Sequence, residues 1–79
     1  DIPSGLSDAD RRELVEQALQ GLSASQRVPL VLHHFEGLRY EEIAEKLGVS
    51  LGKVKTDIFR GREALRRKLH LNLKEEGLV

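Results

Sequence analysis

The chain of 79 residues contains no cysteine, no methionine and no tryptophan, and its only aromatic side chains are Phe35, Tyr40 and Phe59. Without cysteine there is no disulfide and no thiolate chemistry, which fits a reducing cytoplasm. No apolar run approaches the roughly 20 residues that span a bilayer, and no signal peptide is present, so we expect no membrane partner. The missing initiator methionine indicates a piece of a longer protein.

The chain also has little from which an enzyme site could be built. Its only histidines are His33, His34 and His70, and the adjacent pair points to different helix faces. No cysteine is available to complete a zinc set, so we expect no metal and no cofactor. The three glutamates between 41 and 45 begin a helix, where they stabilise the positive end of its dipole. We therefore predict no catalysis and no small-molecule substrate.

The apolar residues predict one small all-α domain over 1–79. Their 39% share is mostly Leu, Val, Ile and Ala, which suits a helical bundle better than a β-sandwich. Spacing and turn residues predict four helices, at about 7–21, 23–37, 40–47 and 51–74. Ser7 and Ser50 can cap the first and fourth, and Ser23 with Gln26 reads as a capping box for the second. The expected core residues are Leu14, Val15, Ala18, Leu19, Leu22, Val28, Val31, Leu32, Phe35, Ile43, Ala44, Leu47, Val54, Ile58, Leu65 and Leu69.

Residues 40–62 have the pattern of a helix-turn-helix that reads DNA. Gly48 ends the first of its helices, at a point where the backbone must turn left-handed. Val49 fills the corner between the two helices, and Ser50 caps the second. The small Ala44 beside the corner lets the helices cross closely.

The net charge of zero hides a strong segregation of charge along the chain. Residues 1–36 carry six acidic and three basic side chains, whereas residues 53–70 carry seven Lys or Arg against Asp57 and Glu63. A basic block that coincides with a recognition helix is typical of a nucleic-acid reader. The alternative is a solvated helix face that is balanced by acids elsewhere.

A helical wheel sorts the residues of the helix 51–74 into two sides. At 100° per residue, Val54, Ile58, Gly61 and Leu65 share one side, and we expect Gly61 to be a close-packing position under another helix. Lysine and arginine can bind phosphates or guanine edges, threonine can read either base type, and an aromatic ring can pack on a thymine methyl. Phe59 faces away from the core, although it could instead contact another helix. The side opposite the core carries Gly52, Lys53, Thr56, Phe59, Arg60 and Glu63, with Lys55 on the flank.

The residues of one known family recur at matching positions between 22 and 69. They are Leu22, Gln26, Arg27, Glu36, Gly37, Leu38, Tyr40, Glu41, Glu42, Ile43, Ala44, Gly48, Gly52, Val54, Lys55, Ile58, Phe59, Arg60 and Arg62. This stretch resembles region four of bacterial sigma factors, particularly the extracytoplasmic-function group. The resemblance implies reading of the minus-thirty-five promoter element, docking on the flap of the RNA polymerase β subunit, and control by an anti-sigma factor.

The resemblance and the helical wheel together define the DNA-binding residues that we expect. By position in the family, Lys55, Thr56, Phe59 and Arg60 would contact bases and phosphates, and His33 would lie near the DNA backbone. The full predicted set is Arg39, Tyr40, Gly52, Lys53, Lys55, Thr56, Phe59, Arg60 and Arg62.

Three positions depart from the family's pattern. Arg39 stands where serine or threonine usually caps the third helix, Lys53 replaces the usual threonine, and Asp57 stands where a basic residue is common. Asp57 is within reach of Lys53 and Arg60 as a side-chain pair and is expected to weaken DNA binding, since an acid repels phosphates. Two alternatives therefore stay open: a sigma mimic that binds an anti-sigma factor without DNA, and the DNA-binding output domain of a response regulator.

The first two helices carry more apolar residues than a small bundle easily buries. We expect some of them to form, with the C-terminal tail Leu71, Leu78 and Val79, a groove for an amphipathic partner helix. The alternative is that these side chains close the domain's own core. The predicted partner-binding residues are Leu14, Leu19, Leu30, Leu32 and Leu73.

Overall fold

The computed structural model describes residues 5–78, and within that range the chain forms four α-helices and no strand. Their bounds are Asp8–Gln20 for α1, Ala24–His34 for α2, Tyr40–Leu47 for α3 and Leu51–Glu75 for α4. The predicted all-α, four-helix fold is confirmed. The second helix ends earlier than expected, because Gly37, with a φ of 71°, belongs to the loop that follows it.

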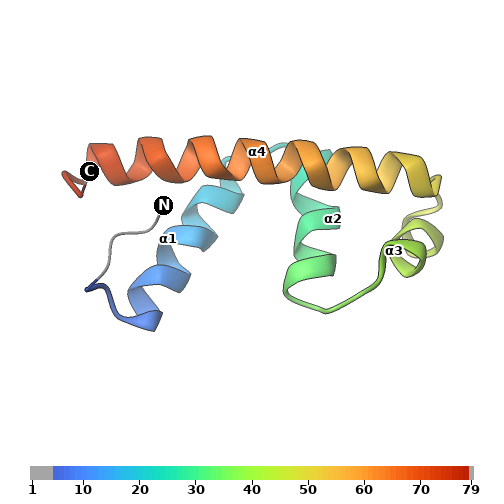
Figure 1. Cartoon of the computed structure of the whole chain (residues 1–79), viewed down its shortest axis with the longest axis horizontal. Coiled ribbons are helices and arrows are strands. Elements are labelled where there is room, and N and C mark those ends of the chain that lie inside the picture. Colours follow the sequence, from blue (N-terminus) through green and yellow to red (C-terminus); the bar gives the residue numbers. More distant parts are fainter. Residues whose placement is uncertain (1–4, 79) are drawn as a thin grey trace.

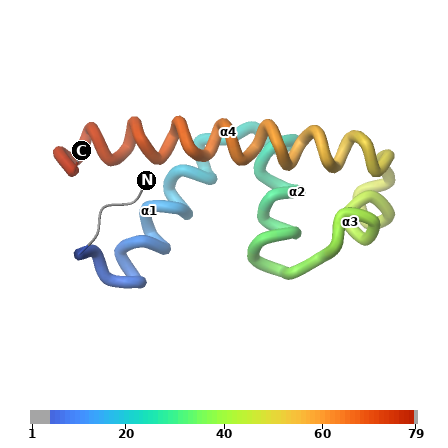
Figure 2. The backbone as a smooth tube through the Cα atoms, viewed as in Figure 1, coloured from blue at the N-terminus to red at the C-terminus, as the bar shows by residue number. Residues whose placement is uncertain are grey.

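The long helix α4 is the spine of the domain (Figure 1). Along it, α1 lies against the C-terminal half, α2 against the middle and α3 against the N-terminal end, as the backbone tube in Figure 2 also shows. At about 1.5 Å per residue, the 25 residues of α4 extend for roughly 37 Å. The longest dimension of the molecule is 40 Å, so this one helix sets the length of the domain.

Two of the three predicted serine caps are present. The hydroxyls of Ser7 and Ser50 each accept a hydrogen bond, at 3.1 Å, from the amide three residues later. The capping box at Ser23 is wrong: this hydroxyl makes no cap bond and lies 3.3 Å from the hydroxyl of Ser25. The amide of Gln26 donates instead to the Ser23 carbonyl oxygen at 3.1 Å, which leaves the hydroxyl without that donor.

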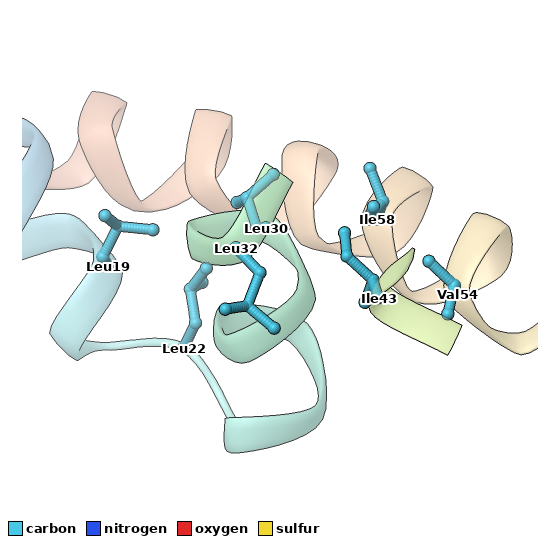
Figure 3. Close-up of a cluster of buried hydrophobic side chains, with 7 residues drawn as sticks. All are labelled: Leu19, Leu22, Leu30, Leu32, Ile43, Val54 and Ile58. Atoms are coloured by element: carbon cyan, nitrogen blue, oxygen red, sulfur yellow. The ribbon is translucent and has the colours of Figure 1, made fainter. Parts of the chain in front are cut away.

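Two clusters of buried side chains hold the other helices on α4. The smaller cluster joins α1 to the C-terminal half of α4 through Leu14, Ala18, Leu69 and Leu73. The larger cluster draws on all four helices and on the turn after α1 (Figure 3). Its buried residues are Leu19, Leu22, Leu30, Leu32, Ile43, Val54 and Ile58.

Gly61 marks a close approach between α2 and α4. A Cβ atom added at Gly61 would lie 2.8 Å from the carbonyl oxygen of Gln26, which is backbone of α2. The prediction of a close-packing glycine is therefore confirmed. Leu30 follows Gln26 by four residues and shares its face of α2, so it is drawn into the larger cluster and is 1% exposed.

This contact sets the rotation of α2 and explains why two residues that were expected in the core are exposed. Val28 is 37% and Phe35 is 56% exposed. With Leu30 turned toward α4, Val28 lies on the other side of the helix, and Phe35 comes after the last helical residue. Leu47, in the last turn of α3, is also exposed rather than buried.

The five leucines that were predicted to line a partner groove lie in the core instead. Each of them is at most 8% exposed, because the two clusters bury their side chains as α1 and α2 pack on α4. The expectation that all five side chains, those of Leu14, Leu19, Leu30, Leu32 and Leu73, are exposed in a groove is therefore wrong, and their contact with a partner stays a prediction. In the C-terminal tail, Leu71 and Leu78 are exposed, and Val79 lies outside the described residues.

Candidate nucleic-acid interface

The turn between α3 and α4 has the geometry of a helix-turn-helix corner. Gly48 has a φ of 67°, in the left-handed region that glycine adopts without strain. The amide of Val49 then donates to the Ala44 carbonyl oxygen at 3.0 Å, and its side chain packs against the larger cluster. Ser50 caps the next helix. These local bonds fix the direction in which α4 leaves the corner.

The buried side of α4 determines which residues it presents to solvent. Val54 and Ile58 are each 1% exposed and belong to the larger cluster. Phe59 is 67% exposed, which confirms the prediction that it faces away from the core. Four exposed residues of α4 are called the reading face below; they are Lys55, Thr56, Phe59 and Arg60.

Gly52 and Lys53 lie in the first turn of α4, where helix amides have no partner within the helix. A Cβ at Gly52 would meet nothing within 4 Å, so the surface there is open. Lys53 is exposed, but its Nζ donates to Oδ2 of Asp57 at 2.6 Å. The predicted pairing of Asp57 with Lys53 is confirmed.

Arg39 holds the start of α3 in the position where the family usually has serine or threonine. Its amide and its Nε both donate to the carboxylate of Glu42, at 2.9 and 3.2 Å. The bond from the amide, and then the bond from the side chain, hold the pKa of Glu42 below its ordinary value. The Arg39 side chain is 75% exposed, so its guanidinium faces solvent at the start of α3.

Tyr40 and His33 connect α3 with the end of α2. Their ring centroids are 4.7 Å apart, and Nδ1 of His33 lies 2.8 Å from the carbonyl oxygen of Leu38. Both residues are partly buried. These contacts stabilise the loop between the two helices, and the nearness of either side chain to DNA stays a prediction.

The side chain of Arg62 contacts α2 and is not counted in the reading face. Its Nε donates to Nε2 of His34 at 3.2 Å. This bond draws the guanidinium toward the end of α2. Its expected contact with DNA stays a prediction, one that this hydrogen bond does not favour.

A shallow hollow of about 340 Å³ lies between α1, α2 and α4, beside Arg62. The sequence predicted a groove on the first two helices that included Leu19 and Leu30, but it placed Phe35 in the core and Arg62 toward DNA. The available signal was the position of Phe35 directly before Glu36 and Gly37, where the helix ends. We call this hollow the Phe35 groove. Its walls are Val15, Leu19, Leu30, Phe35, Leu65 and Leu69, and its polar rim is His34, Arg62 and Arg66.

The hydrogen bond between Arg62 and His34 makes part of the stability depend on pH. Because Nε2 of His34 accepts that bond, the ring is neutral with its proton on Nδ1. Burial, then the Arg62 guanidinium, then His33 lower the pKa of His34 from its ordinary value of 6.5. The folded chain thus binds this proton less readily than the unfolded chain does, so the stabilisation is complete above 6.5 and is lost as the pH falls through the lowered pKa.

We expect the free energy of unfolding to fall as the pH is lowered below 6.5. Urea unfolding at a series of pH values measures this dependence. The matched variant His34→Gln keeps a hydrogen-bond acceptor but cannot titrate, so its profile should be flatter in that range. Identical profiles for the two proteins would contradict the assignment.

Residues 12–65 match the family model described as Sigma-70, region 4. The match covers more than half of the chain and includes the corner and the whole reading face. The chain belongs to the sigma-70 region 4 family. The resemblance noted over residues 22–69 is thereby confirmed.

Curated relatives of this region 4 domain are named as sigma factors. The chain is 43% identical over 61 residues to the RNA polymerase sigma-H factor of Pseudomonas aeruginosa, a match that covers 77% of this chain and 32% of that protein. It is 39% identical over 73 residues to the RNA polymerase sigma factor YlaC of Bacillus subtilis, covering 92% and 42%. It is 48% identical over 52 residues to the ECF RNA polymerase sigma factor SigE of Mycolicibacterium smegmatis, covering 66% and 20%. The chain thus spans less than half the length of these relatives, and their names support the extracytoplasmic-function group.

Among residues 5–78, no three His, Asp or Glu side chains gather in a way that could hold a metal ion. In the same part of the chain, no helix is both long enough and apolar enough to cross a membrane. Every buried side-chain nitrogen or oxygen atom that the structure describes has a hydrogen-bond partner. No interior polar group of these residues therefore points to a bound ligand.

Proposed function

We propose that this region 4 domain recognises promoters as part of a bacterial sigma factor, and that its reading face enters the major groove of the minus-thirty-five element. The observation that carries the proposal is the exposure of Phe59 among Lys55, Thr56 and Arg60, directly after a helix-turn-helix corner. The major groove admits an α-helix and displays a distinct pattern for each base pair.

Each member of the reading face has chemistry that a base-pair edge or a phosphate can use. Arg60 and Lys55 can donate to guanine or neutralise phosphates, Thr56 can donate or accept, and Phe59 can pack on a thymine methyl. The open surface at Gly52 lets a phosphate approach the amide groups at the start of α4. In this proposal the start of α3, with its exposed arginine, lies along the DNA backbone.

Replacing Arg60 or Thr56 by alanine should change which bases are tolerated in the promoter. Each lost base contact should cost about 1–3 kcal/mol of discrimination. The measurement is selection of promoter sequences from a randomised minus-thirty-five element by the parent sigma factor assembled with core polymerase. Lys74→Ala is the matched control, because Lys74 is an exposed cation in the last turn of the same helix. If both variants select the same sequences as the parent, this face does not read the promoter.

We further propose that the parent protein binds core RNA polymerase and that the flap of the β subunit docks in the Phe35 groove. An exposed aromatic residue among apolar walls, with arginines on the rim, suits an amphipathic helix that carries acidic residues. An anti-sigma factor would compete for the same surface. The domain would then act in the cytoplasm, where it binds DNA and polymerase. It would catalyse no reaction.

A second candidate is a sigma mimic that binds an anti-sigma factor without binding DNA. The observation in its favour is Asp57, an acid on the recognition helix that neutralises Lys53. Footprinting and transcription with the parent protein on core polymerase separate the two: failure at every promoter supports the mimic. The family match favours either candidate over the response-regulator output domain.

A further inference from the structure

The first two turns of α4, the helix proposed to read DNA, hold an ion pair between Lys53 and Asp57. Nζ of Lys53 lies 2.6 Å from Oδ2 of Asp57, and the two side chains are 50% and 15% exposed. Asp57 is the better covered partner because it lies in a hollow beside Ser25 and Val28, at the start of α2. Its carboxylate is therefore largely screened from water while the ammonium group of Lys53 stays at the surface.

Other ion pairs of the domain are looser. Arg39 and Glu42 lie 3.2 Å apart with side chains 75% and 47% exposed, and Glu63 and Arg66 lie 3.8 Å apart with both side chains exposed. Water and salt weaken such surface pairs. A short, charge-assisted bond to a covered carboxylate is stronger and less screened. The bond between Lys53 and Asp57 should accordingly persist when DNA approaches.

This bond changes how Lys53 can interact with DNA. A free lysine is a point charge that is attracted to any phosphate, and each such contact adds to the salt dependence of binding. Paired with Asp57, it gives no net attraction to phosphates. Its ammonium group still has three donors, of which the structure shows one used by Asp57. The remaining donors can bind the O6 and N7 acceptors of guanine in the major groove.

We propose that Asp57 is a specificity-determining residue that converts Lys53 from a phosphate contact into a base reader. The inference rests on the proposed function, since it requires α4 to lie in the major groove. The neutral pair lowers affinity for DNA of arbitrary sequence and fixes the direction of the lysine donors. Asp57 thereby widens the difference between the target sequence and all others.

Two single substitutions test this proposal from opposite sides of the pair. Binding of the chain is measured by fluorescence anisotropy, from about 50 to about 200 mM salt, on a duplex of arbitrary sequence and on duplexes that the unaltered chain selects from a randomised library. Asp57→Asn should bind the arbitrary duplex roughly fivefold more tightly, with a salt slope steeper by about one unit. Its preference for selected over arbitrary duplexes should fall by about tenfold.

Lys53→Met should lose the same preference, and because it leaves the Asp57 carboxylate without its partner, it should also flatten the salt slope on the arbitrary duplex. Because Lys53 is exposed, this variant remains informative even if Asp57→Asn is poorly folded, which thermal melts by circular dichroism would reveal. An unchanged preference in Lys53→Met, or an unchanged slope in folded Asp57→Asn, would overturn the inference while leaving the proposed function standing. An unaltered chain that binds no duplex at low salt, and a parent sigma factor that uses no promoter, would overturn the proposed function itself.

Discussion

Gly61→Ala is expected to lower the free energy of unfolding by about 1–3 kcal/mol, the cost that overpacking typically has in a tight interior. The added Cβ would lie 2.8 Å from the Gln26 carbonyl oxygen, so the backbone of α2 would have to move away from α4. That movement loosens Leu30, which is anchored in the larger cluster one helical turn further on. The loss should appear although alanine is the better helix former.

Gly52→Ala is the matched control for this substitution. It makes the same chemical change in the same helix, but at a site where a Cβ would meet nothing within 4 Å. There the higher helix propensity of alanine should stabilise the chain by up to about 1 kcal/mol. Urea unfolding of the two variants and the unaltered chain measures both effects. Equal shifts in the two variants would mean that the crossing of α2 over α4 is not tight.

Phe35→Ala is expected to weaken binding of the parent sigma factor to core polymerase by about 2 kcal/mol or more, as for a central aromatic residue of an interface. The Phe35 side chain lines its groove and is 56% exposed in the free domain. Its removal should affect docking far more than folding, because it supports neither buried cluster. Competition binding to core polymerase at equilibrium measures the loss.

Phe59→Ala provides the opposite result in the same assay. This phenylalanine is comparably exposed, at 67%, but it belongs to the reading face. The variant should retain its affinity for polymerase and lose discrimination between promoter sequences. If Phe59→Ala impairs polymerase binding and Phe35→Ala does not, the assignment of the two surfaces is reversed.

The helix-turn-helix could be predicted because its determinants are local. The turn at Gly48 depends only on the φ angle of that residue. The cap at Ser50 depends only on an amide three residues later. The outward position of Phe59 followed from the same short-range logic, since the apolar spacing of Val54 and Ile58 sets the angle of every other residue on α4.

The rotation of α2 could not be predicted, because it depends on contact with a residue far along the chain. Periodicity placed Phe35 in the core, whereas the crossing at Gly61 selects Leu30 for burial instead. The place of Phe35 in its groove was missed for the same reason. Arg62 was assigned to DNA by its family position, and only the folded chain reveals the hydrogen bond that directs it to His34.

A single uninterrupted α4 carries the reading face near one end and a wall of the Phe35 groove further along. Under the proposed functions, inherited changes can therefore accumulate on one surface while the other is conserved. A duplicated copy could acquire a new promoter preference through substitutions at Thr56 or Arg60 and still assemble with the same polymerase. Substitutions in the Phe35 groove could equally make two copies bind different anti-sigma factors while both read the same promoter. Under these functions, duplicated genes can thus diverge separately in promoter preference and in regulator.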